Sequence, residues 1–512
     1  MATNYWTKFD ESTYHRSCRE EIINPIHGKV SGTIPKWLNG TLIRNGPGLF
    51  EINKSRVSHW FDGMALLHRF EINDGVVTYQ CRFIQSDVYK KNTIANRIVV
   101  TDFGTVAVPD PCETIFHRIS SKFRFKREVN DNTVVTVYPF GDEIYAITET
   151  GVMYKVGNKN LETKTKVDFT KSLGIVTHSS HPHITEDGTM YNLALSFSIK
   201  GLVYHIVCFP NTPQEGSMFD KAYIVANIPA RWTLYPSYMH TFGITENYFI
   251  LIEQPMCLTV PKKILRMFLH TPSHKFMRWY NNEMCRFIVI NRKTGQPVDE
   301  FYSPGFCYFH IINQYEDSNR VVIDVCTFKD ASVLDKYYFD AMKNAQNNPD
   351  YSDMIRGAPH RFILPIAENW PRENRRKIVV SEQISDVICD MPTIYYDKFV
   401  GKDYRYFYAM KLCTVTVCPG ALIKVDVKNK TSKSWCEEGA YPSEPIFVPS
   451  PDAQDEDDGV ILSSLIYGKN ENCVILLVLD AKSFEEIGRV KFETSSPVPR
   501  SAHGWYFPSR SS

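Results

Sequence analysis

Four histidines in this chain stand in settings that suit a metal centre. His181 lies in THSSHPHITEDGT, and His240, His310 and His503 lie in YPSYMHTFG, YFHIINQYED and PRSAHGWYFP. Each lies where a turn signal meets an aromatic or β-branched run, at the end of an expected strand. A neutral imidazole is a good ligand for a borderline transition metal. The intervals are far longer than those of zinc fingers or HExxH helices, so the four suit a large fold whose separate sheets each send one ligand to a common axis.

The residue pattern alone leaves the ligand set open. The first motif holds His178, His181 and His183, and the chain has 15 histidines in all. A single histidine in a strand is more often a packed or surface residue than a ligand. Four histidines at strand ends therefore do not identify a metal site without a further observation.

The motifs HPHITEDGT, SYMHTFGIT, YFHIIN and AHGW occur in the order of the four iron-ligand segments of the carotenoid cleavage oxygenases, which they resemble. The similarity runs from NGTLIRNGPG, near residue 40, to HGWYF near the C-terminus. It implies that His181, His240, His310 and His503 bind one iron(II), with dioxygen as co-substrate. In the family the first histidine of the His-Pro-x unit is the ligand, so we expect a structural hydrogen-bonding role for His183. Four neutral ligands leave the metal its full positive charge and open coordination positions.

A ligand imidazole needs an acceptor for its other N–H group. The resemblance implies that a carboxylate accepts a hydrogen bond from this N–H group in three cases: Glu149 for His240, Asp390 for His310, and Glu444 for His503. His181 would have no carboxylate partner. The family usually has glutamate where this chain has Asp390, which is one methylene shorter. That difference implies that the backbone lies closer to His310, that a water bridges the two side chains, or that the segment aligns differently with the family.

The resemblance also places Phe103, Thr148 and Tyr238 near the iron. Phe103 and Tyr238 would bind substrate, and the Thr148 methyl group could narrow one coordination position. A carotenoid is a long rigid polyene, so dispersion, shape and a few polar contacts must orient it. For Phe103 and Tyr238, packing in the core stays an alternative.

Composition excludes several classes of protein. Aromatic residues make up 13% and hydrophobic residues 43% of 512 positions, and the net charge is +1. No basic stripe is present, so we expect no nucleic-acid partner. The polar N-terminus has no apolar stretch typical of a signal peptide, and no apolar run is long enough to cross a bilayer. The 13 cysteines include no CxxC pair, which favours reduced thiols in the cytoplasm.

Short strands separated by Gly, Asn and Asp turns indicate a sandwich, barrel or propeller. They recur at 39–52, 59–84, 133–156, 240–255, 286–302, 421–438 and 459–493. No exact repeat period selects among these folds. The resemblance implies an all-β, seven-bladed β-propeller with a cap of helices and loops on one face. We expect one domain over residues 1–512, with 1–35 as an irregular lead-in and Asn-Gly-Pro-Gly at 45–48 as a turn.

Two basic amphipathic segments, 112–127 and 261–280, could bind a membrane surface. Their candidate membrane-binding residues are Ile115, Phe116, Ile119, Phe123, Ile264, Leu265, Phe268 and Leu269. Core-facing cap helices are the alternative. Cys112 could carry an acyl chain, although an unmodified thiol is the simpler expectation. A carotenoid dissolves in membranes, so we expect a cytoplasmic protein that associates peripherally with a membrane. Residues 330–347 are expected to form a surface helix, and 454–459 a solvated acidic loop with a weak prospect of an ion site.

The leading interpretation is an iron(II)-dependent dioxygenase with a role in vision. It would cleave zeaxanthin or β-carotene at the central 15,15' double bond into retinoid aldehydes and isomerise one half from trans to 11-cis. The segments RIVVTDFGTVAVPDPC, GKDYRYFYAM and YPSEPIFVPSPD support this, because they resemble the insect branch of the family, which couples cleavage to isomerisation. Three alternatives stay open: an eccentric 9',10' dioxygenase, a retinoid isomerohydrolase that needs no dioxygen, and a non-catalytic binding propeller. Assembly as a homodimer also stays open.

Overall fold

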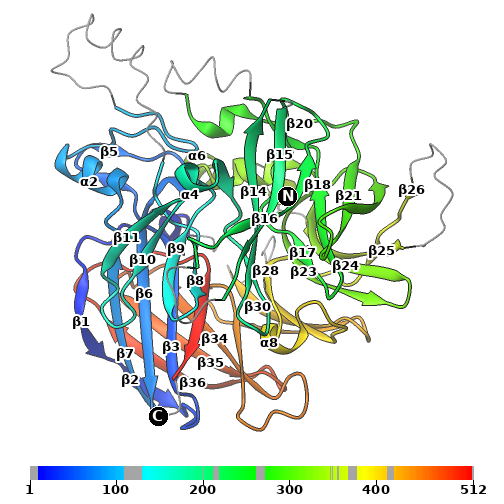
Figure 1. Cartoon of the computed structure of the whole chain (residues 1–512). Helices are drawn as coiled ribbons and strands as arrows, with labels where there is room; N and C mark the ends of the chain where they lie inside the picture. Colours follow the sequence, from blue (N-terminus) through cyan, green and yellow to red (C-terminus); the bar gives the residue numbers. More distant parts are fainter. Residues whose placement is uncertain are drawn as a thin grey trace, which may run out of the picture.

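Seven sheets surround a common axis in the computed structural model of the chain (Figure 1). The structure describes residues 10–108, 130–199, 201–211, 218–260, 271–345, 348, 350–354, 357–366, 377–411 and 420–509. Nearly all strand pairs within the sheets are antiparallel, and each sheet forms one blade. The predicted seven-bladed β-propeller is therefore confirmed.

The first four blades follow the chain from its N-terminal part. Blade 1 contains β1 (Ile22–His27), β7 (Val76–Phe83), β6 (Met64–Asn73), β3 (Gly40–Leu49) and β37 (Gly504–Pro508). Blade 2 contains β11 (Thr163–Asp168), β10 (Val152–Val156), β9 (Glu143–Ile147) and β8 (Thr136–Phe140). Blade 3 contains β12 (Ile175–His178), β13 (His183–Ile184), β14 (Met190–Ser198), β15 (Gly201–Phe209) and β16 (Tyr223–Pro229). Blade 4 contains β17 (Gly243–Ile244), β18 (Tyr248–Glu253), β21 (Cys285–Asn291), β22 (Pro297–Ser303) and β26 (Lys377–Ile378).

The other three blades complete the ring. Blade 5 contains β23 (Cys307–Asp317), β24 (Arg320–Phe328), β25 (Gly357–Pro365) and β27 (Glu382–Gln383). Blade 6 contains β28 (Cys389–Thr393), β29 (Tyr406–Lys411), β30 (Ala421–Asp426) and β31 (Thr431–Cys436). Blade 7 contains β2 (Lys29–Gly32), β36 (Glu486–Glu493), β35 (Cys473–Asp480), β34 (Gly459–Tyr467), β32 (Ala440–Pro442) and β33 (Ile446–Pro449).

Both ends of the chain close the ring. The C-terminal β37 pairs with β3 of blade 1, and the N-terminal β2 pairs with β36 of blade 7. The expectation of an irregular lead-in is thus wrong for the described part of residues 1–35, which contains β1 and β2. These strands lie on the outside of their sheets, and most of their residues are not buried. They therefore lack the apolar alternation that makes a strand recognisable in a sequence.

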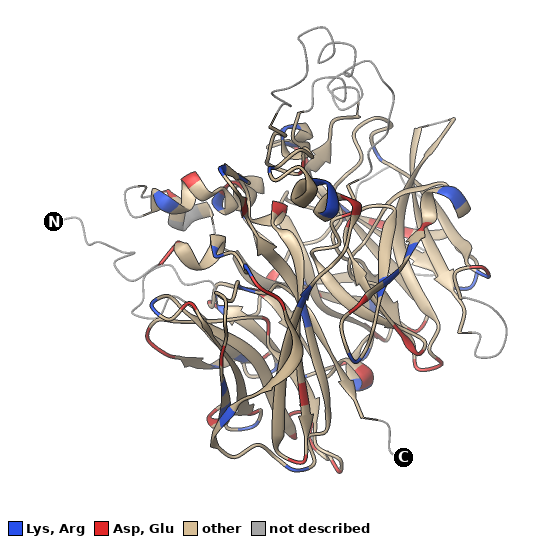
Figure 2. Ribbon diagram, turned by 90° about the vertical axis from the view of Figure 1, so that its left-hand side faces the viewer, with Lys and Arg blue, Asp and Glu red and all other residues tan. Residues whose placement is uncertain are grey.

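The core lies between neighbouring blades. One apolar cluster joins Ile250 and Ile252 of β18 to Ile323 and Val325 of β24. Such strands are buried on both faces, so they read as continuous apolar runs such as CVILLVLD in β35. Acidic and basic residues are interspersed over the outer strands and loops (Figure 2), in keeping with a net charge of +1.

The segment Asn45-Gly46-Pro47-Gly48 belongs to strand β3, so its prediction as a turn is wrong. The glycines allow neighbouring segments to pack closely against β3, and they do not reverse the chain. A Cβ atom on Gly46 would lie 2.7 Å from the backbone nitrogen of Ala502, and one on Gly48 would lie 2.3 Å from Cβ of Leu66. β3 can therefore lie directly against the segment that carries His503.

Short helices and ribbons cover one end of the propeller, at the top of Figure 1. The described ribbons are β4 (Glu51–Ile52) with β5 (Ser55–Arg56), and β19 (Met256–Leu258) with β20 (Met277–Trp279). The described helices are α1 (Ser12–His15), α2 (Asp87–Ile94), α4 (Phe169–Ser172), α6 (Phe339–Lys343), α7 (Tyr351–Met354), α8 (Tyr396–Phe399), η1 (Trp60–Asp62), η2 (Ser273–Phe276) and η3 (Ala331–Tyr337). Of these, α8 lies in the lower half of Figure 1, away from that end. The surface helix expected over 330–347 is instead two short turns, η3 and α6. Val333, Leu334 and Phe339 in them are buried.

Asn45 fastens blade 1 to blade 2 and to the C-terminal segment. Its buried side-chain amide donates to the carbonyls of Thr133 (2.7 Å) and Thr136 (3.0 Å), and its backbone N–H donates to the carbonyl of His503 (2.8 Å). The Asn45 Oδ1 atom accepts the N–H group of Gly46 (2.8 Å). One side chain thereby satisfies three buried backbone groups.

Replacing Asn45 with Ala should lower the free energy of unfolding by about 2–4 kcal/mol, since each buried polar group left unpaired costs roughly 1–3 kcal/mol. Urea unfolding would measure this loss. Asn344→Ala is the matched control, because it removes an exposed amide that donates to the carbonyl of Asp340. Equal stabilities of the two variants would contradict the role given to Asn45.

Candidate metal centre

Each of the seven blades contributes one histidine or carboxylate to a cluster at the axis. Four blades supply histidines: His181 between β12 and β13, His240 before β17, His310 in β23, and His503 before β37. The other three supply carboxylates: Glu149 between β9 and β10, Asp390 in β28, and Glu444 between β32 and β33. The structure thus brings together all seven residues that the sequence indicated for the metal and its supporting carboxylates.

The four imidazoles form one compact cluster. One ring nitrogen from each lies within 4.8 Å of those of the others. The Nε2 atoms of His181 and His240 are 2.9 Å apart, and the ring centroids of His181 and His503 are 4.6 Å apart. Nε2 of His310 is buried and has no hydrogen-bond partner among the described residues. An unsatisfied buried nitrogen that faces three other imidazoles is what a metal ligand requires.

The carboxylates hold the opposite side of three rings. Nδ1 of His310 donates to Asp390 Oδ1 at 2.8 Å, Nδ1 of His503 donates to Glu444 Oε1 at 2.7 Å, and Nδ1 of His240 contacts Glu149 Oε1. An Nδ1–H group that is donated in this way leaves the Nε2 lone pair free to face the axis. The three pairings that the sequence implied are therefore present as contacts.

Asp390 reaches His310 directly in spite of its shorter side chain. The pairing of β28 with β29 is irregular between Asp390 and Thr393, and Met391 has a φ of 54°. A non-glycine residue in the left-handed region at a bulge re-aims the neighbouring side chain. The direct contact means that no bridging water is needed between Asp390 and His310.

Burial and mutual contact set the protonation of the cluster. Burial, and then the other three histidines, hold the pKa of His181 well below its ordinary value. Burial also lowers the pKa of His310, against the opposing effect of Asp390. Burial alone would raise the pKa of Asp390, but attraction and hydrogen bonding to His310 lower it below the ordinary value. His181 and His310 are therefore neutral and Asp390 is ionised near neutral pH.

Arg44 supports the centre and was not singled out from the sequence. Its fully buried guanidinium donates to the carbonyls of Glu444 (3.0 Å) and Ala502 (2.6 Å) and to Ser501 Oγ (2.9 Å). Burial lowers the pKa of Arg44 to about 10, and the Glu444 carboxylate opposes that shift. The sequence feature that could have indicated it is the arginine in TLIRNGPG, within an expected strand. A charged side chain in a buried strand requires polar partners.

The predicted substrate residues lie in an aromatic cluster next to the histidines. Phe103 and Tyr238 pack against an apolar cluster that contains Phe328 and buried Phe309, the residue before His310. The Tyr238 hydroxyl group donates to Glu149 Oε1 at 2.8 Å. Thr148 is buried and directly precedes Glu149. The sequence did not indicate the contact between Tyr238 and a supporting carboxylate.

A cavity of about 340 Å³ runs along the axis from the histidines. Three ligand histidines follow closely after a residue that packs in an aromatic cluster. These residues are Tyr238 before His240, Phe309 before His310 and Ala502 before His503. The residues on the C-terminal side line the cavity, including Ile311, Thr241 and Gly504. The histidines therefore separate an aromatic compartment from an axial cavity.

The other two histidines of the first motif are engaged elsewhere. His183 donates from Nε2 to the carbonyl of Phe242 at 2.8 Å, and its Nδ1 lies 3.0 Å from the Tyr396 hydroxyl. Nδ1 of His178 lies 3.0 Å from the carbonyl of Ser179. Neither residue belongs to the cluster of four.

The candidate membrane residues in segments 112–127 and 261–270 lie outside the described residues, as does Cys112. These are Ile115, Phe116, Ile119, Phe123, Ile264, Leu265, Phe268 and Leu269. Their role stays a prediction. In the part of the chain that the structure describes, no helix is long and apolar enough to cross a membrane.

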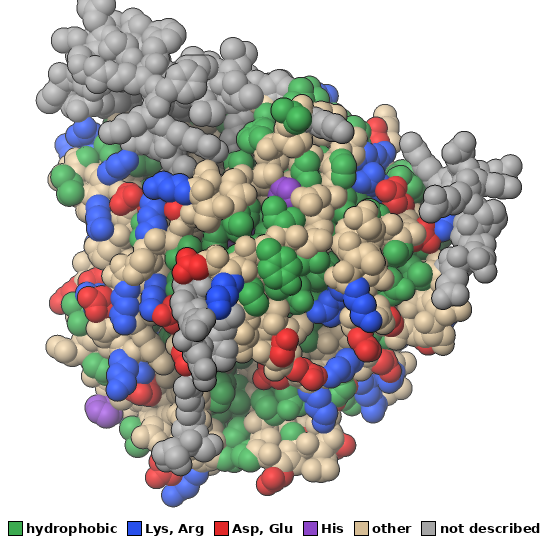
Figure 3. Space-filling view, in the orientation of Figure 1, with side chains coloured by type: hydrophobic (Ala, Val, Ile, Leu, Met, Phe, Trp, Pro, Cys, Tyr) green, Lys and Arg blue, Asp and Glu red, His purple; other side chains and the backbone are tan. Residues whose placement is uncertain are grey.

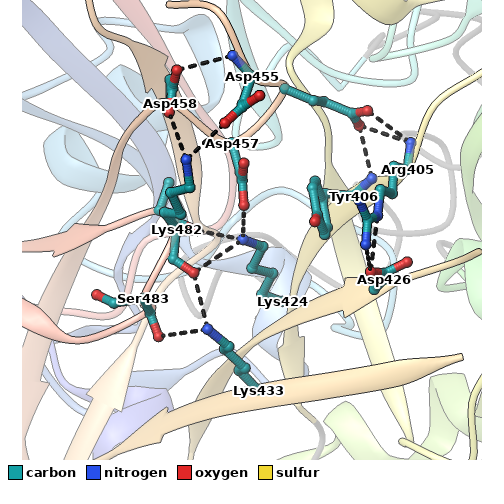
Figure 4. A network of polar contacts seen from close by, with 12 residues as sticks. Arg405, Tyr406, Lys424, Asp426, Lys433, Asp455, Asp457, Asp458, Lys482 and Ser483 are labelled. Atoms are coloured by element: carbon teal, nitrogen blue, oxygen red, sulfur yellow. Dashed lines mark hydrogen bonds and ion pairs between the residues drawn. The ribbon is translucent and has the colours of Figure 1, made fainter. Parts of the chain in front are cut away.

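A second cluster of carboxylates lies in the acidic loop at 454–459. Asp455, Asp457 and Asp458 lie close enough together to hold a cation. Lysine side chains already occupy the space between them (Figure 4): Lys482 pairs with Asp455 (2.7 Å) and Asp458 (3.5 Å), and Lys424 pairs with Asp457. The cluster is an ion-pair network that joins the loop to its neighbouring strands.

Comparison with known proteins identifies the family. The profile of the family described as RPE65, retinal pigment epithelial membrane protein, matches residues 15–508. The chain is 45% identical to the carotenoid isomerooxygenase of Galleria mellonella, over 98% of this chain and 97% of that protein. The chain belongs to the RPE65 family of carotenoid oxygenases. The resemblance inferred from the four histidine motifs is thereby confirmed.

A second relative supports the family, and a solved structure supports the fold. The human β,β-carotene 15,15'-dioxygenase is 36% identical over 93% of this chain and 91% of its own. The crystal structure of a cobalt-substituted Synechocystis apocarotenoid oxygenase superposes with a TM-score of 0.80 at 22% identity, covering 98% of both chains. That likeness shows the fold. The four-histidine cluster in a protein of this family indicates a metal site.

Within this site, His181→Ala should weaken metal binding by more than about tenfold, since loss of even a supporting partner typically costs ten- to a hundredfold. His183→Ala is the matched control from the same motif. It should keep one metal ion per chain while losing stability, because it removes two hydrogen bonds outside the cluster. Elemental analysis after dialysis would measure the bound metal. Full metal in His181→Ala with none in His183→Ala would contradict the choice between them.

Proposed function

We propose that this protein is an iron(II)-dependent carotenoid dioxygenase that cleaves the central 15,15' double bond and isomerises one product to the 11-cis form. The observation that carries the proposal is the cluster of four histidines, three of them in contact with carboxylates, beside a buried aromatic cluster. The names of the relatives add the reaction, since one is a carotenoid isomerooxygenase and another a β,β-carotene 15,15'-dioxygenase.

The donor set fits iron(II). His181, His240, His310 and His503 would hold the ion through Nε2, and three carboxylates would keep their Nδ1–H groups oriented. Bound iron(II) would supply the binding and activation of dioxygen. No carboxylate from Glu149, Asp390 or Glu444 needs to bind the metal itself, because each accepts a hydrogen bond from an imidazole Nδ1–H group. The site would therefore keep a higher positive charge than a site of two histidines and one carboxylate.

The aromatic cluster would bind the polyene. Phe103 lies 5.6 Å from Phe61 between ring centroids, and Tyr238 lies 6.2 Å from Phe309. Flat apolar side chains orient a rigid polyene by shape and dispersion, and their π-faces favour cationic character that develops on it. The hydrogen bond to Glu149 fixes the Tyr238 ring at the side of His240. Thr148, next to Glu149, would limit the space beside the metal.

Cleavage converts one C=C bond and one dioxygen molecule into two aldehyde groups. Isomerisation of one half requires that the walls hold the two halves of a symmetric substrate differently. A single site can do this, because the substrate has equal ends and the surrounding side chains do not. The proposed substrates are carotenoids such as zeaxanthin or β-carotene, and the retinoid product would serve vision.

Supplying β-carotene or zeaxanthin under ¹⁸O-labelled dioxygen should yield one all-trans and one 11-cis C20 aldehyde, each carrying the label. Normal-phase chromatography with mass spectrometry would resolve the two products. Metal-stripped protein is the control and should give no product.

Other product patterns separate the remaining interpretations. Two all-trans C20 aldehydes would remove isomerisation from the proposal. Products of unequal length would indicate an eccentric dioxygenase, and turnover without dioxygen would indicate an isomerohydrolase. Binding of carotenoid without any product would leave a non-catalytic propeller.

Membrane association is a further part of the proposal, because the substrate dissolves in lipid. Val106 and Val108, just before segment 109–129, are 56% and 41% exposed. Leu234 is 45% exposed, and its carbonyl accepts the N–H group of Val260, just before segment 261–270. Apolar side chains are also exposed across the middle and upper part of the face in Figure 3. The N–H groups of Ser273 and His274 donate to the carbonyls of Asp102 and Phe103, which brings the two regions together. The protein would then be cytoplasmic and peripheral, and nothing in this surface requires a homodimer.

Changing Val106, Val108 and Leu234 together to Ser should release the protein from liposomes, since each inserted apolar side chain contributes up to about 1.5–3 kcal/mol. Liposome flotation would measure the loss. Val380→Ser is the control, because Val380 is 82% exposed next to β26, at the side of the molecule in Figure 1. Flotation of the triple variant equal to that of the control would show that this surface does not bind lipid.

A further inference from the structure

His181 is the one histidine of the cluster that has no carboxylate partner among the described residues. Its Nε2 faces Nε2 of His240 at 2.9 Å, so its Nδ1 points away from the centre. Nδ1 lies 3.4 Å from the hydroxyl oxygen of Tyr138 in β8. The carboxylate contacts of His310 and His503 are shorter, at 2.8 and 2.7 Å, as expected for charged acceptors.

Tyr138 is held in place by aromatic packing. Its ring lies 4.8 Å from Trp505, which follows His503 by two residues, and it stands edge-on to His181 at 6.3 Å. The contact with His181 Nδ1 is its one side-chain hydrogen bond among the described residues. Burial, and then the nearby Tyr396 and Glu444, raise the pKa of Tyr138, so the hydroxyl group is neutral.

We propose that Tyr138 is the positioning residue of His181: its hydroxyl oxygen accepts a hydrogen bond from the Nδ1–H group and so keeps Nε2 directed at the metal. This inference rests on the proposed iron site. A neutral phenol withdraws the proton less than a carboxylate does, so His181 is the weakest electron donor of the four ligands. The centre is thereby asymmetric, with three carboxylate-supported imidazoles and one tyrosine-supported imidazole.

Tyr396 provides a matched control within the same cavity wall. Its hydroxyl oxygen accepts the N–H group of Ile184 (3.1 Å) and lies 3.0 Å from Nδ1 of His183, and its ring packs on Trp505 at 5.6 Å. It resembles Tyr138 in lining the axial cavity and in contacting a histidine. The difference is that His183 lies outside the cluster of four.

The experiment compares Tyr138→Phe and Tyr396→Phe in the full-length protein. Both changes keep the ring and its packing on Trp505 and remove one hydroxyl group. Iron(II) affinity would be measured by chelator competition, and the absorption spectrum of the cobalt(II)-loaded protein would report the ligand environment. Tyr138→Phe should weaken iron(II) binding by about tenfold, the lower end of the usual range for such partners, and shift the cobalt(II) bands. Tyr396→Phe should leave both unchanged, and the metal-free variants should unfold at similar temperatures.

Three results would overturn the inference. Iron(II) affinity of Tyr138→Phe within twofold of the wild type would show that the hydroxyl group does not position His181. Equal weakening by Tyr396→Phe would assign the effect to the cavity wall. A wild-type protein that binds no iron(II) would remove the proposed iron site itself and this inference with it, whereas the first two results leave that site intact.

Discussion

Closure of seven blades around one axis is the constraint on which the rest of the structure depends. Each blade contributes one histidine or carboxylate to the cluster at the axis, giving four histidines and three carboxylates. No short segment could assemble this set, because its members are spread from residue 149 to residue 503. The ring is closed by β37 on β3 and by β2 on β36, so both ends of the chain hold the centre together.

Burying so many titratable groups is unfavourable unless they satisfy one another. The carboxylates of Asp390 and Glu444 accept hydrogen bonds from His310 and His503, and Glu444 also accepts one from the N–H group of Gly504. Arg44 supplies the buried positive charge next to Glu444. The resulting network fixes the imidazole tautomers before any metal binds. The centre can therefore present imidazole nitrogens to a metal while the aromatic compartment on one side stays apolar.

The sequence predicted the chemistry of the centre better than the path of the backbone. The four histidine motifs and the segments around Glu149, Asp390 and Glu444 were recognisable by their likeness to a family, and the structure brings all of them to the axis. The propeller could not be derived from spacing, because the blades are joined by segments of different lengths. β1 and β2 were missed because they are exposed outer strands, and Asn45 to Gly48 appeared to be a turn because glycine serves close packing as well as chain reversal. Tyr138 and Arg44 act through contacts between distant segments, which no local pattern reveals.

The central claim is that one iron ion binds to four imidazoles and to no protein carboxylate. Iron K-edge X-ray absorption spectroscopy of the purified, iron-loaded protein tests it most directly, since imidazole rings give a characteristic multiple-scattering pattern. The account predicts one iron per chain with four imidazole ligands. A first shell with fewer imidazoles, or one that includes a carboxylate from Glu149, Asp390 or Glu444, would contradict it.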